Sequence, residues 1–126
     1  MTSSETAFFT GKPEALSLYE VFRTRLLEIC PQAEIRVGRT QIGFYNPRFF
    51  SAVSFLPARK AKDRPREFIT VTFGLAYRND SPRIDVATEP YPDRWTHHIL
   101  IASADQIDDE LMSWVAEAAD FSEAKR

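Results

Sequence analysis

The 126-residue sequence predicts a two-layer α+β domain: an N-terminal helix, an antiparallel sheet of five or six strands, and a C-terminal helix. Three observations lead to this fold class. Apolar residues recur at helical spacing near the N-terminus and again near the C-terminus, whereas between these segments they alternate with polar residues as in strands. We expect a single domain over residues 1–126, with both helices packed on one face of the sheet.

The N-terminal helix is predicted from Pro13 to Ile29, since proline suits the first helical turn. Its apolar stripe consists of Ala15, Tyr19, Phe22, Leu26 and Ile29. The helix should end there because Cys30 precedes Pro31, and a residue before proline avoids the α conformation. Residues 1–7 are polar, and we expect them to be disordered.

Short apolar runs separated by turn signals predict the strands. They cover residues 35–37, 42–44, 49–56, 68–77 and 95–101, with a weak sixth strand at 84–87. The strand at 68–77 alternates most regularly, with Ile69, Val71 and Phe73 on one face. Residues 57–67 are polar and basic with proline near both ends, which predicts a loop, and residues 89–93 predict another.

The C-terminal helix is predicted to begin at Ser103, which has Gln106 three residues later and so forms a capping box. Its buried face consists of Ile107, Leu111, Trp114, Val115 and Ala118. Its first turns are acidic, with Asp105, Asp108, Asp109 and Glu110. Negative charge there complements the helix dipole, and the segment lacks the ligand spacing of a calcium site, so we expect no metal.

The composition is that of an ordinary globular domain, with 44% hydrophobic and 27% charged residues and a net charge of −2. The single cysteine, Cys30, excludes an internal disulfide framework and a multi-cysteine zinc site. The N-terminus lacks the pattern of a signal peptide, and no run of ~18 apolar residues predicts a membrane span. We therefore expect a cytoplasmic protein that does not associate with membranes.

The only two histidines, His97 and His98, are adjacent in the last predicted strand. Because side chains alternate between the faces of a strand, the pair is poorly placed to bind one metal ion. His97 shares its face with Trp95 and Ile99, which makes it either a buried structural histidine or a general base. The sequence has no nucleophile elbow and no glycine-rich phosphate loop, so we predict no cofactor and favour a non-enzymatic role.

Basic and aromatic residues interleave between Arg36 and Phe55, with Tyr45, Phe49 and Phe50 among the aromatics. A sheet that presents rings and guanidinium groups can stack bases and neutralise phosphates, although rings that face a helix layer would be core. The 57–67 loop adds further cations, which are Arg59, Lys60, Lys62, Arg64 and Arg66. These are candidate nucleic-acid contacts or a solvated loop.

Several motifs resemble those of a bacterial family of domains of unknown function. They are Phe9-Thr10-Gly11-Lys12-Pro13, Arg39-Thr40-Gln41-Ile42-Gly43-Phe44, Arg48-Phe49-Phe50-Ser51-Ala52-Val53, Thr96-His97 and the segment from Ile107 to Trp114. The resemblance covers nearly the whole chain and implies a compact α+β fold with no established activity. The family includes small stand-alone proteins and C-terminal modules, some attached to nuclease-like domains.

Four polar residues stand inside these otherwise hydrophobic motifs, namely Arg39, Thr40, Arg48 and His97. We expect them to converge on one side of the sheet and bind an anionic ligand or protein partner through charge-assisted hydrogen bonds. Two alternatives stay open, a nucleic-acid-associated accessory domain and a small hydrolase or lyase with His97 as its base. The exposed edge of such a sheet leaves open a monomer or a homodimer formed through an edge strand.

Overall fold

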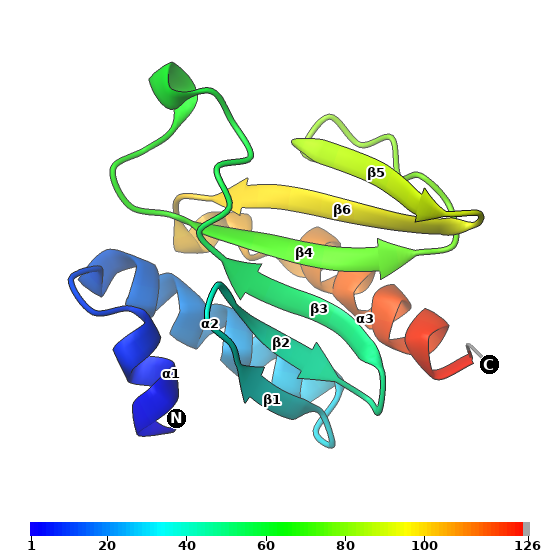
Figure 1. Ribbon diagram of the computed structural model, residues 1–126, viewed down its shortest axis with the longest axis horizontal. Coiled ribbons are helices and arrows are strands. Elements are labelled where there is room, and N and C mark those ends of the chain that lie inside the picture. The colour runs from blue at the N-terminus through cyan, green and yellow to red at the C-terminus, as the bar shows by residue number, and fades with distance from the viewer. Residues whose placement is uncertain (125–126) are drawn as a thin grey trace.

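In the computed structural model, which describes residues 1–124, one six-stranded antiparallel sheet lies against two long helices (Figure 1). The strands are β1 Glu34–Val37, β2 Gln41–Tyr45, β3 Phe49–Ser54, β4 Ile69–Leu75, β5 Val86–Tyr91 and β6 Arg94–Ile101, in the spatial order β1-β2-β3-β4-β6-β5. The helices are α1 Ser3–Phe8, α2 Pro13–Ile29 and α3 Asp109–Ala124, with short 3₁₀ turns at Ala61–Asp63 and Ala104–Gln106. The predicted α+β class is confirmed. Residues 125 and 126, part of the predicted domain, lie outside the described residues.

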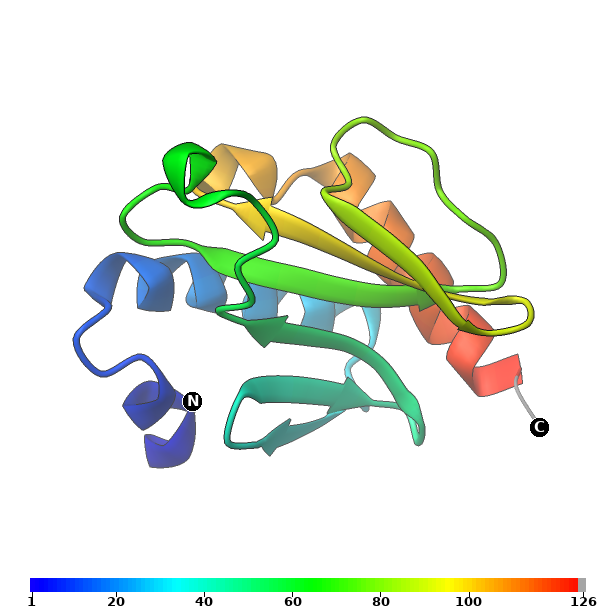
Figure 2. The same cartoon turned by 45° about the horizontal axis from the view of Figure 1, so that its top comes forward.

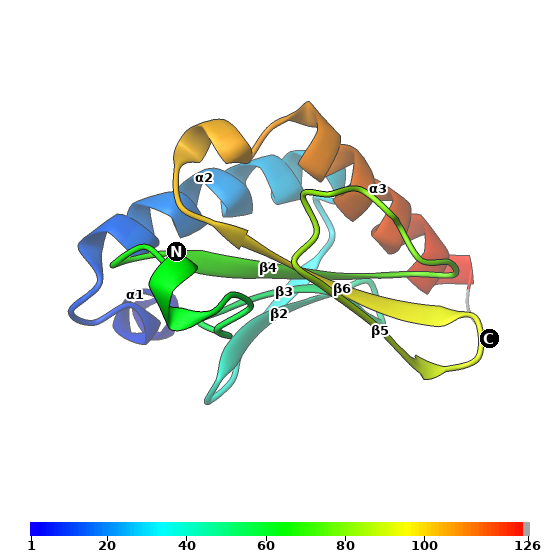
Figure 3. The same cartoon turned by 90° about the horizontal axis from the view of Figure 1, so that it is seen from above.

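Helices α2 and α3 both cover one face of the sheet, as expected, and no long helix within residues 1–124 covers the other face (Figure 3). Strand alternation divides the side chains accordingly. The helix-side positions of β4 and β6 are Ile69, Val71, Phe73 and Leu75 and their partners Ile101, Ile99, His97 and Trp95. We call the uncovered surface the open face. It carries the intervening pairs, such as Thr72 with His98 and Gly74 with Thr96.

The N-terminal prediction is wrong, because residues 3–8 form helix α1 instead of a disordered tail. Thr2 and Glu5 make a capping box in which each side chain accepts a hydrogen bond from the other residue's backbone N–H, at 3.1 and 3.0 Å. The Glu5 side chain is only 1% exposed, and it accepts hydrogen bonds from the Tyr19 hydroxyl and from Arg23 Nε, the latter at 2.7 Å. These bonds to α2 hold the N-terminal helix in place.

The predicted start of the last helix also needs correction. Ser103 and Gln106 form the expected capping box, but it caps the short 3₁₀ turn at 104–106. The long helix α3 begins at Asp109, and the Asp108 carboxylate accepts the Leu111 N–H at 3.0 Å. Arg83 contacts Asp108 at 2.9 Å and Glu110 at 2.9 Å. The acidic first turn is therefore neutralised by an arginine from the loop before β5.

Strand β5, the predicted weak strand, lies later in the chain than expected. It covers Val86–Tyr91 instead of 84–87, and so includes most of the predicted loop at 89–93. Pro90 is tolerated because β5 is an edge strand whose pairing with β6 is irregular between Thr88 and Tyr91. The sequence rule that reads proline as a loop signal fails at such an edge.

The 57–67 segment forms the expected loop, which rises from the end of β3 and returns to β4 (Figure 2). Three contacts fix it. Arg59 Nε donates to Asp85 at 2.8 Å, and the Thr70 hydroxyl donates to the Leu56 carbonyl at 2.7 Å. At its far end, the Glu67 carboxylate accepts the N–H groups of Glu14 and Ala15, so it caps helix α2 from a distant part of the chain.

Candidate ligand cavity on the open face

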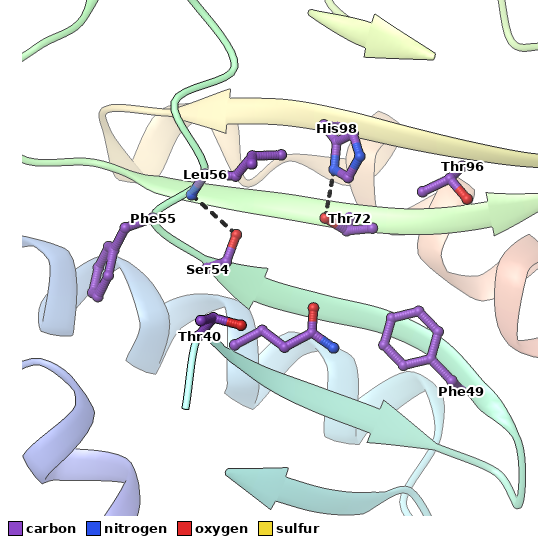
Figure 4. Close-up of a pocket in the computed structure, with 9 residues that line it drawn as sticks. Thr40, Phe49, Ser54, Phe55, Leu56, Thr72, Thr96 and His98 are labelled. Atoms are coloured by element: carbon purple, nitrogen blue, oxygen red, sulfur yellow. Dashed lines mark hydrogen bonds between the residues drawn. The ribbon is translucent and has the colours of Figure 1, made fainter. Parts of the chain in front are cut away.

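The open face contains a cavity of about 750 Å³ between strands β2, β3, β4 and β6 (Figure 4). Its lining consists of Thr40, Gln41, Phe49, Ser54, Phe55, Leu56, Thr72, Thr96 and His98. Most of the cavity wall is apolar, whereas hydroxyl, amide and imidazole groups provide the polar contacts. His98 is the only titratable side chain in this lining. A cavity of this size with few polar groups is typical of small-molecule sites.

On the β6 side of the cavity, His98 lies beside Thr72 on β4, its directly paired residue in the sheet (Figure 4). His98 Nδ1 and Thr72 Oγ1 are 2.8 Å apart, which is hydrogen-bond distance. Burial lowers the pKa of His98, and the neighbouring His97 lowers it further. The ring is therefore neutral at physiological pH and can accept at one nitrogen and donate at the other.

One wall of the cavity is the chain segment that leaves β3. The Leu56 N–H donates to Ser54 Oγ at 3.2 Å, which turns the backbone toward the open face (Figure 4). Phe55 stacks on Phe8 of α1 with ring centroids 5.1 Å apart, and Lys12 Nζ lies 4.7 Å from the Phe55 centroid. The N-terminal segment thus supports this wall.

The opposite wall is Phe49, which belongs to a row of stacked groups across β1, β2 and β3. The Phe49 and Tyr45 rings meet edge to face at 5.6 Å, and the Arg36 guanidinium lies 4.0 Å from the Tyr45 centroid. Gly43 makes room for this row, because a Cβ there would come within 2.9 Å of the Tyr45 ring. The expected interleaving of aromatic and basic residues thus exists on the open face for Arg36, Tyr45 and Phe49, whereas Phe44 and Phe50 are buried in the core.

A smaller cavity of about 180 Å³ adjoins the first and shares Phe49 and Thr96 with it. It extends toward the β5–β6 hairpin, where Tyr91 is 67% exposed and Arg94 is also exposed. The second cavity also contacts Leu75 and Trp95 of the helix side and Phe121 of α3, so it lies at the end of the sheet next to the β5–β6 hairpin.

The four residues expected to bind an anion do not converge. Arg39 and Thr40 lie in the β1–β2 turn, whereas Arg48 lies in the β2–β3 turn at the opposite end of β2. His97 points to the helix side of the sheet and is fully buried. Of the four, only Thr40 lines the cavity, and Arg39 is its exposed neighbour at the rim. The prediction that these residues converge is wrong, because the β1–β2 and β2–β3 turns lie at opposite ends of β2.

His97 is a structural residue with no access to a substrate. Its ring stacks on Phe73 at 5.0 Å with an interplanar angle of 7°, and its Nε2 accepts the Asn79 N–H at 2.9 Å. Burial lowers the pKa of His97, whereas the nearby backbone groups of Phe73 and Trp95 act to raise it. The burial of the His97 ring in the core does not fit the predicted role of a base that reaches a substrate.

The basic loop divides into anchored and exposed cations. Arg59 is anchored by Asp85 at 2.8 Å and donates to the Leu100 carbonyl at 3.3 Å. Arg64 is half-buried, and its Nε is enclosed without a hydrogen-bond partner among residues 1–124. Lys60, Lys62 and Arg66 are exposed and form no ion pair within the same residues. Of the five predicted nucleic-acid contacts, these last three are both exposed and free of ion pairs within residues 1–124.

The described part of the chain holds no group of three or more metal-ligating side chains, and none of its helices is long and apolar enough to cross a membrane. Cys30 is buried, and burial raises the pKa of its thiol. His98 and Thr72 were not among the site residues predicted from the sequence, whereas Phe49 was one of the predicted stacking aromatics. The alternation of apolar and polar residues in β4 and β6 could have indicated these two residues, because Thr72 and His98 share the face opposite the core.

The fold and the cavity define a two-layer α+β protein with a ligand-sized site on an open sheet face. The chain belongs to the family described as Domain of unknown function (DUF5655), whose profile matches residues 5–122. This match confirms the resemblance to a family of domains of unknown function. The same comparisons found no similar curated protein and no similar solved structure.

Proposed function

We propose that this protein is a binding module that holds a small ligand in the cavity on its open face. The ligand combines an apolar or planar body with an anionic group. The observation that carries the proposal is the 750 Å³ cavity, in which apolar walls enclose polar groups that are not all paired within the protein.

The apolar body of the ligand packs against the walls of the cavity. Phe49 lies at one end of the cavity and Leu56 at the other, and each offers carbon to an apolar group beside it (Figure 4). Burying an apolar group of this size contributes roughly 1.5–3 kcal/mol. The floor supplies orientation through the hydroxyls of Thr72 and Thr96 and the ring of His98.

The anionic group of the ligand lies at the rim instead of the floor. No side chain lining the cavity carries a positive charge at neutral pH, whereas Arg39 lies next to the lining residue Thr40 and forms no ion pair within residues 1–124. An exposed arginine attracts an anion modestly, since solvent screens the pair. The proposed anion contact therefore keeps Arg39 from the set predicted from the sequence and no longer includes Arg48 and His97.

Benzoate is a suitable first probe because it joins a ring to one negative charge. Titration into ¹⁵N-labelled protein should shift the amide resonances of β3, β4 and β6 around the cavity, and Phe49→Ala should weaken binding about tenfold. Arg66→Gln is the matched control, since Arg66 is exposed on the basic loop and outside the cavity lining. Shifts confined to other surfaces, or unchanged binding by Phe49→Ala, would overturn the proposal.

A second candidate function is the binding of single-stranded nucleic acid. It is favoured by the row of Arg36, Tyr45 and Phe49 and by the second cavity next to it. Bases stack on such rings, and the exposed cations would face phosphates. A short oligothymidylate should then bind with an affinity that falls steeply with salt, and Lys60→Glu should weaken it. Oligothymidylate that fails to bind at low salt rules this candidate out.

A further inference from the structure

One polar group of the cavity, the imidazole of His98, has a ring nitrogen available to a ligand. His98 Nδ1 is engaged with Thr72 Oγ1 at 2.8 Å, whereas Nε2 has no partner among residues 1–124. Nε2 is also absent from the enclosed, unpaired atoms of this region, so it keeps access to solvent through the cavity. Whether Nε2 carries a proton decides whether the cavity offers a donor or an acceptor at this point.

Thr72 determines the position of that proton. The Thr72 side chain is nearly buried, at 7% exposure, and its hydroxyl has no second partner in the described part of the chain. If the hydroxyl donates to His98 Nδ1, its proton is satisfied and the ring proton lies on Nε2. If Nδ1–H donated instead, the hydroxyl proton would be left unpaired on a nearly buried group, which is costly. The first arrangement leaves only the accessible Nε2–H unpaired.

The adjacent histidine has the opposite arrangement. His97 Nε2 accepts the Asn79 N–H at 2.9 Å, so this nitrogen carries no proton. A neutral imidazole has one ring proton, and in His97 it therefore lies on Nδ1. The two histidines of the chain hold opposite tautomers because a different neighbour occupies one nitrogen of each ring.

We propose that the cavity recognises a hydrogen-bond acceptor of its ligand, such as a carbonyl or carboxylate oxygen, through Nε2–H of His98, with Thr72 as the residue that positions the proton. This inference rests on the proposed ligand site and adds the chemistry of the group that enters it. The hydrogen bond comes from an uncharged donor, so a neutral amide and a carboxylate both satisfy it. A ligand that offers only donors at this point leaves two N–H groups facing each other.

The tautomers are measurable on the full chain without any ligand. Long-range ¹H–¹⁵N NMR of the imidazole rings distinguishes a protonated from an unprotonated ring nitrogen, and the chain has only two histidines. We expect His98 to be protonated on Nε2 and His97 on Nδ1, with His97→Gln and His98→Gln assigning the signals. Protonation of His98 on Nδ1 would overturn the inference, whatever the protein binds.

The role of Thr72 is tested by two variants that preserve the β-branched or hydroxyl character of the site. Thr72→Val keeps the shape and removes the hydroxyl, and it should raise the population of the Nδ1-protonated form of His98 severalfold. Thr72→Ser keeps the hydroxyl and should restore the tautomer of the unmodified protein. An unchanged tautomer in Thr72→Val would show that Thr72 does not position the proton.

Acceptor recognition is tested with two fragments of similar shape. Benzamide offers a carbonyl oxygen, whereas benzylamine offers only donors, so benzamide should bind about tenfold more tightly. Thr72→Val should reduce this preference, and Arg66→Gln should leave it unchanged. Equal binding of the two fragments would overturn the inference while leaving the ligand site intact. If no fragment, including benzoate, shifted resonances around the cavity, the proposed function itself would fail.

Discussion

The two faces of the sheet place adjacent histidines in opposite surroundings. On the helix face, His97 is fully buried, stacks on Phe73 and receives the Asn79 N–H. On the open face, His98 shares a cavity with hydroxyl groups and keeps one nitrogen without a partner among residues 1–124. The helix face therefore stabilises the fold, and the open face retains the unpaired polar groups and the space that a ligand requires.

The largest expected effect is on the helix face. Phe73 is fully buried, and its ring lies 5.0 Å from His97 and 5.8 Å from Trp114. Phe73→Ala should lower the free energy of unfolding by about 3–5 kcal/mol because it leaves a cavity in the core. Urea unfolding measures the loss. Thr72→Val, one residue away on the open face, removes the hydrogen bond to His98 and should cost about 0.5–1.5 kcal/mol. Similar losses of stability in both variants would contradict the conclusion that the helix face stabilises the fold more than the open face does.

The second effect concerns the buried carboxylate that holds α1 in place. Burial alone would raise the pKa of Glu5, but hydrogen bonds from Arg23 and Tyr19 outweigh it and lower the pKa from 4.5 to about 2. A lowered carboxyl pKa stabilises the protein above pH 4.5, and the contribution disappears as the pH falls toward 2. Glu5→Gln should therefore cost about 3 kcal/mol at neutral pH.

Urea unfolding of Glu5→Gln at several pH values tests this sign. Its deficit should shrink as the pH falls below 4.5, because a protonated Glu5 resembles glutamine. The matched control is Glu34→Gln, which removes an exposed carboxylate paired with Arg36 and should change stability little. A Glu5→Gln deficit that does not change with pH would show that the charge of Glu5 is not what stabilises α1.

The third effect separates the two histidines. His97→Gln should lower the free energy of unfolding by about 1–3 kcal/mol, because it removes a buried acceptor of a backbone N–H. Burial lowers the pKa of both rings below 6.5, so the folded protein binds fewer protons than the unfolded chain, and stability should fall as the pH drops below 6.5. His98→Gln should instead change benzamide binding more than stability. If His97→Gln weakened benzamide binding selectively, the assignment of the two faces would be reversed.

The smallest expected effect is at the rim of the cavity. Arg39→Gln should weaken benzoate by about threefold, because the arginine is exposed and its attraction for an anion is screened. Benzamide, which has no charge, should bind this variant as it binds the unmodified protein. Calorimetric titration of both fragments gives the two affinities. Equal loss for benzoate and benzamide would mean that Arg39 shapes the site instead of attracting charge.

Sequence patterns predicted the elements with strong periodicity and missed those that depend on distant contacts. Helix α2 begins and ends at the predicted residues, since Pro13 and Cys30-Pro31 are local signals. The Thr2 and Glu5 capping box was equally local, yet polar composition led to a prediction of disorder. No local pattern shows that Glu67 caps α2 or that Arg83 neutralises the start of α3, because these pairs are far apart in the chain.

The candidate site illustrates the same limit. Alternation placed the two histidines on opposite faces, which the structure confirms. Arg39, Thr40, Arg48 and His97 were the predicted site because they are polar residues inside hydrophobic motifs. Arg39 and Arg48 are separated by the length of β2, and the neighbours that give His98 its role come from β3 and β4.

The fold class, the helix-covered face and the division of each strand into an apolar and a polar side follow from local spacing and burial, so they could be predicted from the sequence. Which polar side chains share a cavity depends on the tertiary structure. Strand order and register bring Thr72 beside His98 in a cavity that Phe49 and Leu56 also line. That arrangement depends on pairings between strands far apart in the chain, and so on the free energy of the whole fold.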